Sequence, residues 1–271
     1  MNLRFDELAE TARALLRYGP VPIVFADRSF AFLIDNWLEH ARRAGVKHVL
    51  LVALDDTVMA HAETPECRRV QLPFTGDLAE LWLLRLLVFE RLAREGIDFV
   101  HSDLDAVWLG DPRAECFADP ALDLVFSQGT FYPDQAHAAW GFVLCCGLFA
   151  ARGRSAAARF FAAAHERAAI ERDDQIAVNL LLLESGIEWR RSGQEPYELR
   201  VGDRRISCFR QMVSGFSEAA GLAVGMLPFH CVPRLPIGFP GAVVKHPFSL
   251  RSPASKIAAL KRDGVWLMAP N

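Results

Sequence analysis

Residues 99–112 read FVHSDLDAVWLGDP, an apolar segment that runs into two aspartates spaced one residue apart. In a strand the side chains at positions i and i+2 point to the same face, so we expect Asp103 and Asp105 to converge on one point. Paired carboxylates at a strand end suit a hard divalent cation that also holds a phosphate. The alternative is a polar turn that leaves a buried strand, because aspartate is common in turns.

Two apolar segments upstream, residues 22–26 and 49–54, have the continuous hydrophobic pattern of parallel strands buried on both faces. Residues 30–44 between them predict a helix, so the three segments form a βαβ unit of an α/β fold. Asp27 and Asp55 follow the two strands, at the sheet edge where ligands bind in such folds. Each could instead close a local turn.

The remaining chain alternates predicted helices and strands. Apolar spacing and capping residues predict helices at 3–18, 77–95, 155–171, 172–183 and 255–262. Continuous apolar runs predict strands at 70–72, 122–127, 142–150 and 243–244. Residues 128–139 are predicted to be a polar, aromatic loop. The pattern weakens after residue 186, where residues 188–208 are interpreted as short strands and glycine and proline are frequent over 211–239.

The composition limits the class of protein. A chain of 271 residues with 52% hydrophobic residues can bury a large core, and its net charge of −3 without a long basic block argues against a nucleic-acid partner. The six cysteines form no CxxC pair, so reduced thiols are expected. No uncharged apolar run reaches the length of a membrane span. We therefore expect a location that is cytoplasmic or peripheral to a membrane, with no transmembrane segment.

Several motifs together resemble a known family, the nucleotide-diphospho-sugar transferases of glycosyltransferase family 77. The matching segments are Asn36-Trp37-Leu38, Leu54-Asp55, the DLDAVWLGDP run of residues 103–112, Arg85 on the preceding helix, Asp174-Gln175 with Asn179, His246, Lys256 and Gly264-Val265-Trp266. The resemblance implies one GT-A domain over residues 1–271, a Rossmann-like mixed sheet flanked by helices on both faces. Its nucleotide-binding half would span about 1–112 and its acceptor and catalytic half about 113–271.

The resemblance also implies a chemistry. A nucleotide-sugar donor, often UDP-linked, would pass its sugar with retained configuration to an acceptor that is a glycan, a protein or a small molecule. A divalent cation, Mn²⁺ or Mg²⁺, would be held by Asp103, Asp105 and His246. The candidates for binding the nucleotide sugar are Asp27, Asp55, Arg85, Asp103, Lys245 and Lys256. The catalytic candidates are Asp174 and Gln175, because a carboxylate or amide oxygen near the anomeric carbon serves either retaining route.

Each of these assignments has a structural alternative. His246 could be a surface histidine before Pro247, Arg85 could extend its charge to solvent, and Asp173 or Asp174 could cap a helix. Trp108 is predicted to be a core residue, and Trp140 a platform for an acceptor sugar.

Two alternative functions remain. A nucleotidyltransferase on a similar sheet would carry a glycine-rich loop after the first strand, where this chain has Asp27-Arg28-Ser29-Phe30. A catalytically impaired sugar-nucleotide-binding protein is suggested by Cys145-Cys146-Gly147, where the resembled family has an asparagine whose amide could hold a sugar hydroxyl.

Overall fold

The computed structural model describes residues 2–61, 67–191, 193, 195–236, 240–250 and 252–268. The chain divides into two compact units. The first is built from Met1–Phe74, His101–Ala114 and His230–Asn271, and the second from Thr75–Val100 and Glu115–Phe229. The first unit thus takes its last segment from the C-terminal part of the chain.

Three parallel strands form the sheet of the first unit, in the order β3-β2-β1: Cys67–Gln71 (β3), Val49–Ala53 (β2) and Val21–Ala26 (β1). Ile23 lies opposite Leu50, and Val49 opposite Cys67. Every residue of β2 is buried, which explains its unbroken apolar sequence. The predicted βαβ unit is confirmed.

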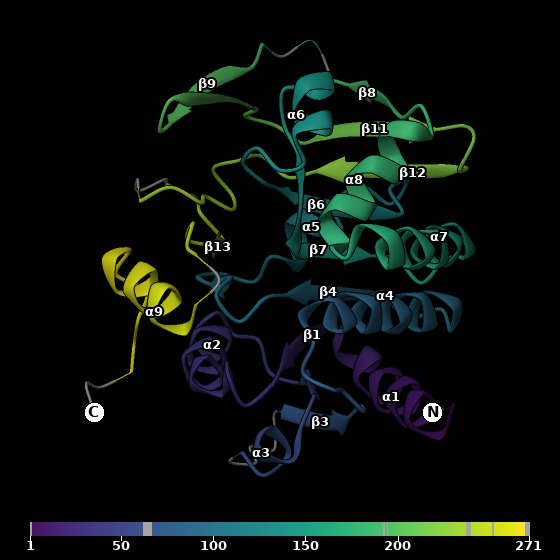
Figure 1. Cartoon of the computed structure of the whole chain (residues 1–271), viewed down its shortest axis with the longest axis vertical. Helices are drawn as coiled ribbons and strands as arrows, with labels where there is room; N and C mark the ends of the chain where they lie inside the picture. Colours follow the sequence, from purple (N-terminus) through teal and green to yellow (C-terminus); the bar gives the residue numbers. More distant parts are fainter. Residues whose placement is uncertain are drawn as a thin grey trace. The chain divides into compact units, whose positions relative to one another are not determined.

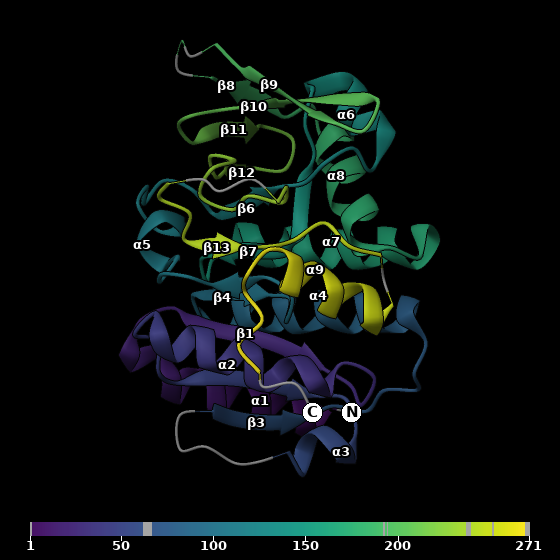
Figure 2. The same cartoon turned by 90° about the vertical axis from the view of Figure 1, so that its left-hand side faces the viewer.

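Helices cover both sides of these strands. Helix α1 (Asn2–Leu15) and helix α2 (Ile34–Arg43) lie on opposite sides of β1 (Figures 1 and 2). Short 3-10 turns, Leu16–Tyr18 and Ala31–Leu33, take up the ends of the two predicted helices, and α3 (Asp56–Met59) follows β2.

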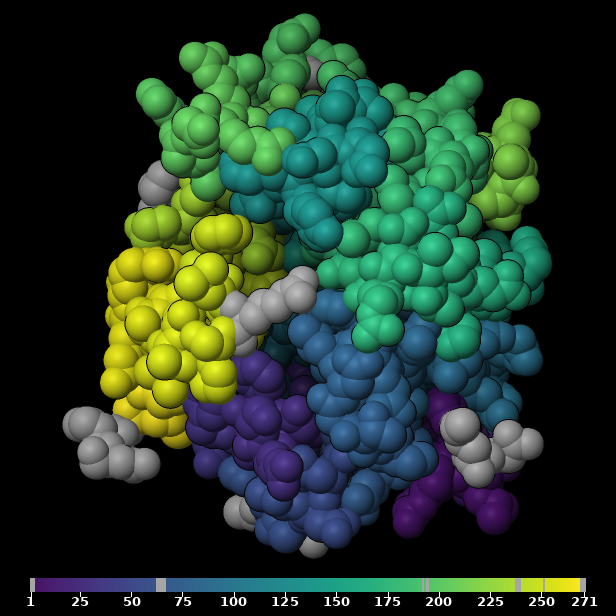
Figure 3. Space-filling model, viewed as in Figure 1, coloured from purple at the N-terminus to yellow at the C-terminus, as the bar shows by residue number. Residues whose placement is uncertain are grey.

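Residues 265–267 pack on α2, and Figure 3 shows the yellow C-terminal part of the chain against the purple N-terminal part. The Asn36 side chain donates to the Val265 carbonyl at 3.2 Å and accepts from the Leu267 amide at 2.8 Å. His40 Nε2 lies 2.9 Å from the same Val265 oxygen. These buried bonds hold the residues that follow helix α9 (Pro253–Arg262) against the N-terminal part of the unit.

A short antiparallel pair joins two distant parts of the sequence. Strand β4 (Phe99–Ser102) leads through a turn to β5 (Val107–Trp108), which pairs with β13 (Val244–Lys245) so that Val244 lies opposite Trp108. Trp108 is fully buried, as predicted, and its ring meets Trp37 edge-on at a centroid distance of 5.3 Å. The pairing of β5 with β13 brings the residue after β13, His246, into the first unit.

The second unit has a mixed sheet of five strands in the order β7-β6-β12-β11-β8. The β6 and β12 pair is parallel, and the β6–β7, β11–β12 and β11–β8 pairs are antiparallel. A separate hairpin pairs β9 with β10 (Figure 2). The strand bounds are Leu124–Gln128 (β6), Leu144–Ala151 (β7), Glu188–Arg190 (β8), Tyr197–Val201 (β9), Arg204–Cys208 (β10), Val213–Ser217 (β11) and Leu222–Met226 (β12).

Helices α4 and α7 lie side by side in the second unit (Figure 1). Phe89 of α4 stacks on Phe99 at 5.5 Å and meets Phe149 edge-on at 4.9 Å, so an aromatic core lies beneath the helices. Asp77 accepts from the Ala79 amide, which confirms the predicted start of α4. The helix bounds are Leu78–Arg94 (α4), Arg113–Cys116 (α5, at the division between units), Asp134–Trp140 (α6), Ser155–Glu171 (α7) and Asp174–Glu184 (α8).

The loop predicted at 128–139 is wrong in its second half, because α6 forms there. Ala136 and Trp140 are one helical turn apart, and both are buried. Gly141 ends the helix in the left-handed conformation, with φ of 81°. Among the residues that the structure describes, no helix is both long and apolar enough to cross a membrane.

Candidate functional site

The two aspartates of the DLD motif lie in a turn. The Ala106 amide donates to the Asp103 carbonyl at 2.9 Å, so β4 ends at Ser102 and the chain reverses before β5. The predicted reason for their convergence, alternation along a strand, is therefore wrong. The sequence predicts either a polar turn or a pair of converging carboxylates. In the structure the segment is a polar turn, and its two carboxylates also converge.

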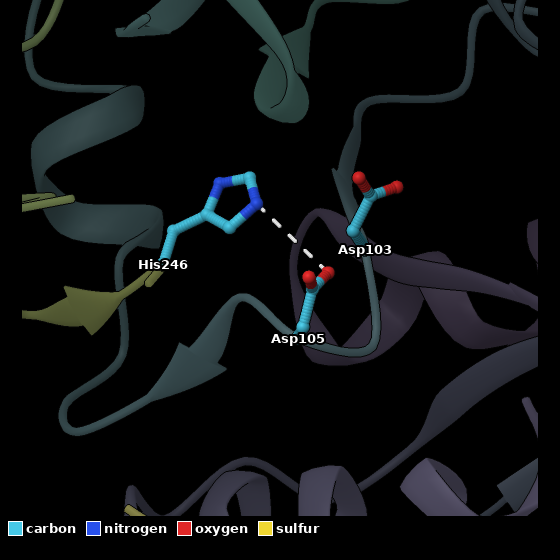
Figure 4. Close-up of side chains that lie close together, drawn as sticks. All are labelled: Asp103, Asp105 and His246. Carbon is cyan, nitrogen blue, oxygen red and sulfur yellow. Dashed lines mark ion pairs between the residues drawn. The ribbon is translucent and has the colours of Figure 1, made fainter. Parts of the chain in front are cut away.

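Asp103, Asp105 and His246 form a cluster that we call the metal triad. Each offers one ligand atom, and these atoms all lie within 4.8 Å of one another (Figure 4). Asp105 and His246 are buried, with 3% and 4% of their surfaces exposed, whereas Asp103 is half-buried. The structure thus brings together the three residues predicted to bind a metal, from the β4–β5 turn and the end of β13.

Burial lowers the pKa of the His246 imidazole to about 3, and the Arg234 guanidinium acts in the same direction against the Asp105 and Asp103 carboxylates. The imidazole is therefore neutral at pH 7, which is the form that binds metals. Two carboxylates and a neutral imidazole are a donor set that fits a divalent cation such as Mn²⁺ or Mg²⁺.

Side chains from other parts of the first unit contact the metal triad. Lys256, on α9, donates from its ammonium to Asp105 Oδ2. Arg234 Nη1 lies 2.9 Å from His246 Nδ1, and His101 Nε2 lies 3.4 Å from Asp103 Oδ1. Two side-chain cations thus accompany the two carboxylates in this part of the first unit.

In the second unit, Arg85 and Asp174 form a buried ion pair. Arg85 projects from α4, Asp174 is the first residue of α8, and Nη2 lies 3.3 Å from Oδ2. The same Nη2 donates to the Cys146 carbonyl at 2.9 Å. Because the two side chains are only 7% and 5% exposed, the alternative that Arg85 reaches solvent is wrong. The capping of α8 falls to Asp173, whose Oδ1 accepts from the Ile176 amide at 3.0 Å.

Gln175 links two neighbouring segments. Its Nε2 donates to the Tyr132 carbonyl at 2.7 Å, and its Oε1 accepts from the Cys146 amide at 3.4 Å. Asn179, one turn later, bonds to both the amide and the carbonyl of Leu144, at 2.8 and 2.9 Å. The start of α8 and the start of β7 are therefore held together by side-chain amides.

The sequence of the chain matches the nucleotide-diphospho-sugar transferase family over residues 44–239. The chain belongs to this family. The predicted enzyme class, a glycosyltransferase that uses a nucleotide-diphospho-sugar, is confirmed by the match. The assignment to family 77 in particular stays a prediction.

Two solved structures share the fold of this transferase. The galactosyltransferase LgtC, crystallised with donor and acceptor sugar analogues, is 11% identical with a TM-score of 0.53, over 93% of this chain and 98% of LgtC. The glycosyltransferase GlyE of Streptococcus pneumoniae is 11% identical with a TM-score of 0.52, over 92% of this chain and 61% of GlyE. A search of curated proteins finds no match. The predicted fold class, a mixed sheet flanked by helices, is confirmed.

The aspartates at the ends of β1 and β2 have local partners in this transferase. Asp27 Oδ1 accepts from the Ser29 and Phe30 amides at 2.9 and 3.2 Å, which is an Asx turn. Asp55 caps α3 through the Val58 amide at 3.0 Å and also accepts from the Arg28 amide at 2.6 Å. Both carboxylates therefore shape the strand-end loops, and their contact with a nucleoside stays a prediction.

Lys245 is buried beside a carboxylate. Its Nζ lies 3.2 Å from Asp263 Oδ2 and also donates to the Leu235 carbonyl. The Lys245 and Asp263 side chains are 8% and 1% exposed. Lys245 thus has a structural partner in the first unit, and its predicted contact with the diphosphate has not been tested.

Trp140 corrects one prediction made from the sequence. It is 8% exposed and packs on Phe142 and Trp189, at centroid distances of 5.8 and 5.5 Å, so it is a core side chain and offers no open platform for a sugar. Cys145 and Cys146 are buried. Burial raises the pKa of the Cys146 thiol well above its ordinary value, and the Asp174 charge adds to the effect, so Cys146 stays protonated.

Sequence reasoning missed Arg234, which lies 2.9 Å from His246 Nδ1. Arg234 falls in the stretch where the helical and strand patterns weaken, and no motif marks it. It also missed the contact between Lys256 and Asp105. Lys256 was predicted to bind the nucleotide sugar and Asp105 the metal, and neither prediction implies that the two side chains meet. The contact between Lys256 and Asp105 forms only because the fold brings α9 to the β4–β5 turn.

Proposed function

We propose that this chain is a metal-dependent, retaining glycosyltransferase that takes its sugar from a UDP-linked donor. The observation that carries the proposal is the metal triad, a carboxylate–carboxylate–imidazole set in a chain of the nucleotide-diphospho-sugar transferase family. The acceptor would be a glycan, a protein or a small molecule. Family membership favours this function over the nucleotidyltransferase alternative.

In the first unit, Asp103, Asp105 and His246 would hold Mn²⁺ or Mg²⁺. Such a cation, when bound, supplies a Lewis acid that neutralises charge on the departing diphosphate. Lys256 would add a point charge to a phosphate oxygen, since its ammonium already lies at Asp105. Lys245 is a second candidate for this contact. Asp27 and Asp55 would bind the nucleoside through the carboxylate lone pairs that do not accept hydrogen bonds within their turns.

In the second unit, Asp174 and Gln175 would act at the anomeric carbon. An oxocarbenium-like centre develops positive charge, and an anionic carboxylate or an amide oxygen stabilises it. The Arg85 guanidinium, 3.3 Å away, supports the ionised form of Asp174 and holds its orientation. Gln175 is the more accessible of the two, and its amide is oriented by Tyr132 and Cys146.

Binding of UDP with Mn²⁺ tests the proposal. We expect the melting temperature to rise by about 5–10 °C at ligand concentrations near one hundred times Kd. Asp105→Asn should abolish the rise, because the amide removes one of the two triad charges. Asp111→Asn is the matched control, since Asp111 lies in the same segment but pairs with Arg113. An unchanged rise in Asp105→Asn would contradict the assignment of the metal triad.

A second measurement separates an active transferase from a binding protein that has lost activity. The active enzyme should slowly hydrolyse its UDP-sugar and release free sugar even without an acceptor. Release that requires Asp174 but survives Asp173→Asn would support the proposed roles. Donor binding without any release, across the common UDP-sugars, would favour the impaired binding protein.

A further inference from the structure

We propose that Lys256 couples the two ligands of the first unit: it occupies Asp105 until a diphosphate takes its ammonium, so the divalent cation binds tightly only together with the diphosphate. The inference rests on the proposed function of the metal triad.

The contact between Lys256 and Asp105 is the first observation. The ammonium donates to Oδ2 of a carboxylate whose side chain is only 5% exposed. A buried carboxylate is strongly destabilised when it has no counter-charge. Lys256 therefore supplies that charge when no metal is present, and a cation that enters the triad must compete with it for the same carboxylate.

The charge balance around the metal triad is the second observation. Two carboxylates, Asp103 and Asp105, lie with the Lys256 ammonium at Asp105 and the Arg234 guanidinium at His246. A divalent cation that enters the metal triad lies near these two positive side chains, which oppose its binding. A diphosphate carries negative charge that offsets the charge of the divalent cation and of these side chains. Binding of the cation and binding of the diphosphate therefore favour each other.

The Lys256 ammonium can change partners more readily than the Arg234 guanidinium can. Its side chain is 20% exposed, and an ammonium on a four-carbon stem can change partners without moving its helix. Its place on α9 is stable, because Ser252 caps the helix and Pro253 occupies its first turn. Transfer of the ammonium from Asp105 to a phosphate oxygen would leave Asp105 available to the metal.

Linkage makes the proposal quantitative. If UDP strengthens Mn²⁺ binding by some factor, Mn²⁺ must strengthen UDP binding by the same factor. Couplings of this kind are typically about 5–150-fold. Without the Lys256 charge, the Mn²⁺ affinity of the nucleotide-free protein should rise and the coupling should shrink.

The experiment is calorimetric titration of Mn²⁺ into the full chain, with and without UDP. We expect the wild-type protein to bind Mn²⁺ at least about tenfold more tightly with UDP. Lys256→Met should bind Mn²⁺ alone at least about tenfold more tightly than wild type does, a gain that misfolding cannot produce. Lys256→Arg keeps the charge and should resemble wild type. Lys261→Met is the matched control, a change of equal charge on the same helix, and should also resemble wild type.

The outcomes separate the two proposals. If wild type binds Mn²⁺ with UDP but Lys256→Met alone binds it no more tightly than wild type alone, the role of Lys256 is wrong and the metal site stands. Equal Mn²⁺ affinity of wild type with and without UDP also overturns the coupling. If wild type binds no Mn²⁺ even with UDP, the metal-dependent function fails, and the coupling fails with it.

Discussion

Each unit of this transferase contains a pair of opposite charges with a buried carboxylate, and the two pairs are built differently. In the second unit, Arg85 and Asp174 are 7% and 5% exposed, and Arg85 also bonds to the Cys146 carbonyl. In the first unit, Asp105 is buried to the same degree, but its partner Lys256 is 20% exposed and lies on a flexible stem. The carboxylates are alike, and the cations differ.

The difference indicates what each pair can do. A guanidinium held by two partners in a closed core keeps its carboxylate in one place, which suits a group that must be oriented for chemistry. A partly exposed ammonium on a flexible stem can leave its carboxylate when a diphosphate offers it another partner. We therefore interpret Arg85–Asp174 as a fixed pair and Lys256–Asp105 as an exchangeable one.

The largest effect on stability should come from breaking the fixed pair. Arg85→Met leaves the Asp174 charge buried without its partner, and we expect the free energy of unfolding to fall by about 3–5 kcal/mol. Urea titration measures this loss. Adding Asp174→Asn to Arg85→Met should restore part of it, because the buried charge is then removed.

Two variants serve as controls for that prediction. Arg91→Met, on the same helix but in a surface pair with Glu95, should cost less than about 1 kcal/mol. Lys256→Met should cost less than Arg85→Met, because Lys256 is 20% exposed and water can reach Asp105 once the lysine is removed. Equal losses for Lys256→Met and Arg85→Met would show that the two pairs are equally fixed.

An effect of intermediate size on stability should come from protonation of His246 as the pH is lowered. Its pKa is about 3 in the folded protein and near 6.5 in the unfolded chain, so the unfolded state binds more protons between these values. Stability therefore falls as the pH is lowered from about 6.5 toward 3, with a loss of about 2 kcal/mol at pH 5 from this group. The charges that face the imidazole are those of Asp103, Asp105, Arg234 and Lys256.

The comparison of wild type with His246→Asn isolates this contribution. Urea titrations at pH 7 and pH 5, without metal, should show a smaller loss of stability in the variant, because Asn does not titrate. The same loss in both proteins would mean that His246 can take up a proton in the folded state. The surroundings of His246 would then adjust to a new charge as readily as we propose for Lys256.

The smallest effect should come from the helix caps beside the two pairs. Asp173 caps α8 next to Asp174, and Ser252 caps the helix that carries Lys256. Substitution of either by Ala should cost about 1 kcal/mol, with the buried Asp173 at the upper end and the exposed Ser252 at the lower. Thermal unfolding of both variants measures the difference. A larger loss for Ser252→Ala would contradict the contrast between a rigid and an adjustable region.

Much of the fold could be predicted from local patterns. The unbroken apolar run of β2 and the capping aspartate Asp77 of α4 signal their elements within a few residues, because burial on both faces and helix ends impose local requirements. Strands β11 and β12 lie in a stretch whose pattern is weak, and α6 lies within a predicted loop. In these places the packing of Ala136 and Trp140, or the pairing of Val213 with Met226, decides the outcome.

By itself, the sequence determined the α/β alternation, the DLD motif and the residues able to bind a cation, because residue chemistry and local periodicity suffice for these. Tertiary structure alone decided that a turn makes Asp103 and Asp105 converge, that β13 delivers His246, and that Lys256 holds Asp105. The turn is local, but the other two contacts join segments far apart in the chain. They depend on strand register and on the need of a buried charge for a partner, and neither can be worked out from one segment at a time.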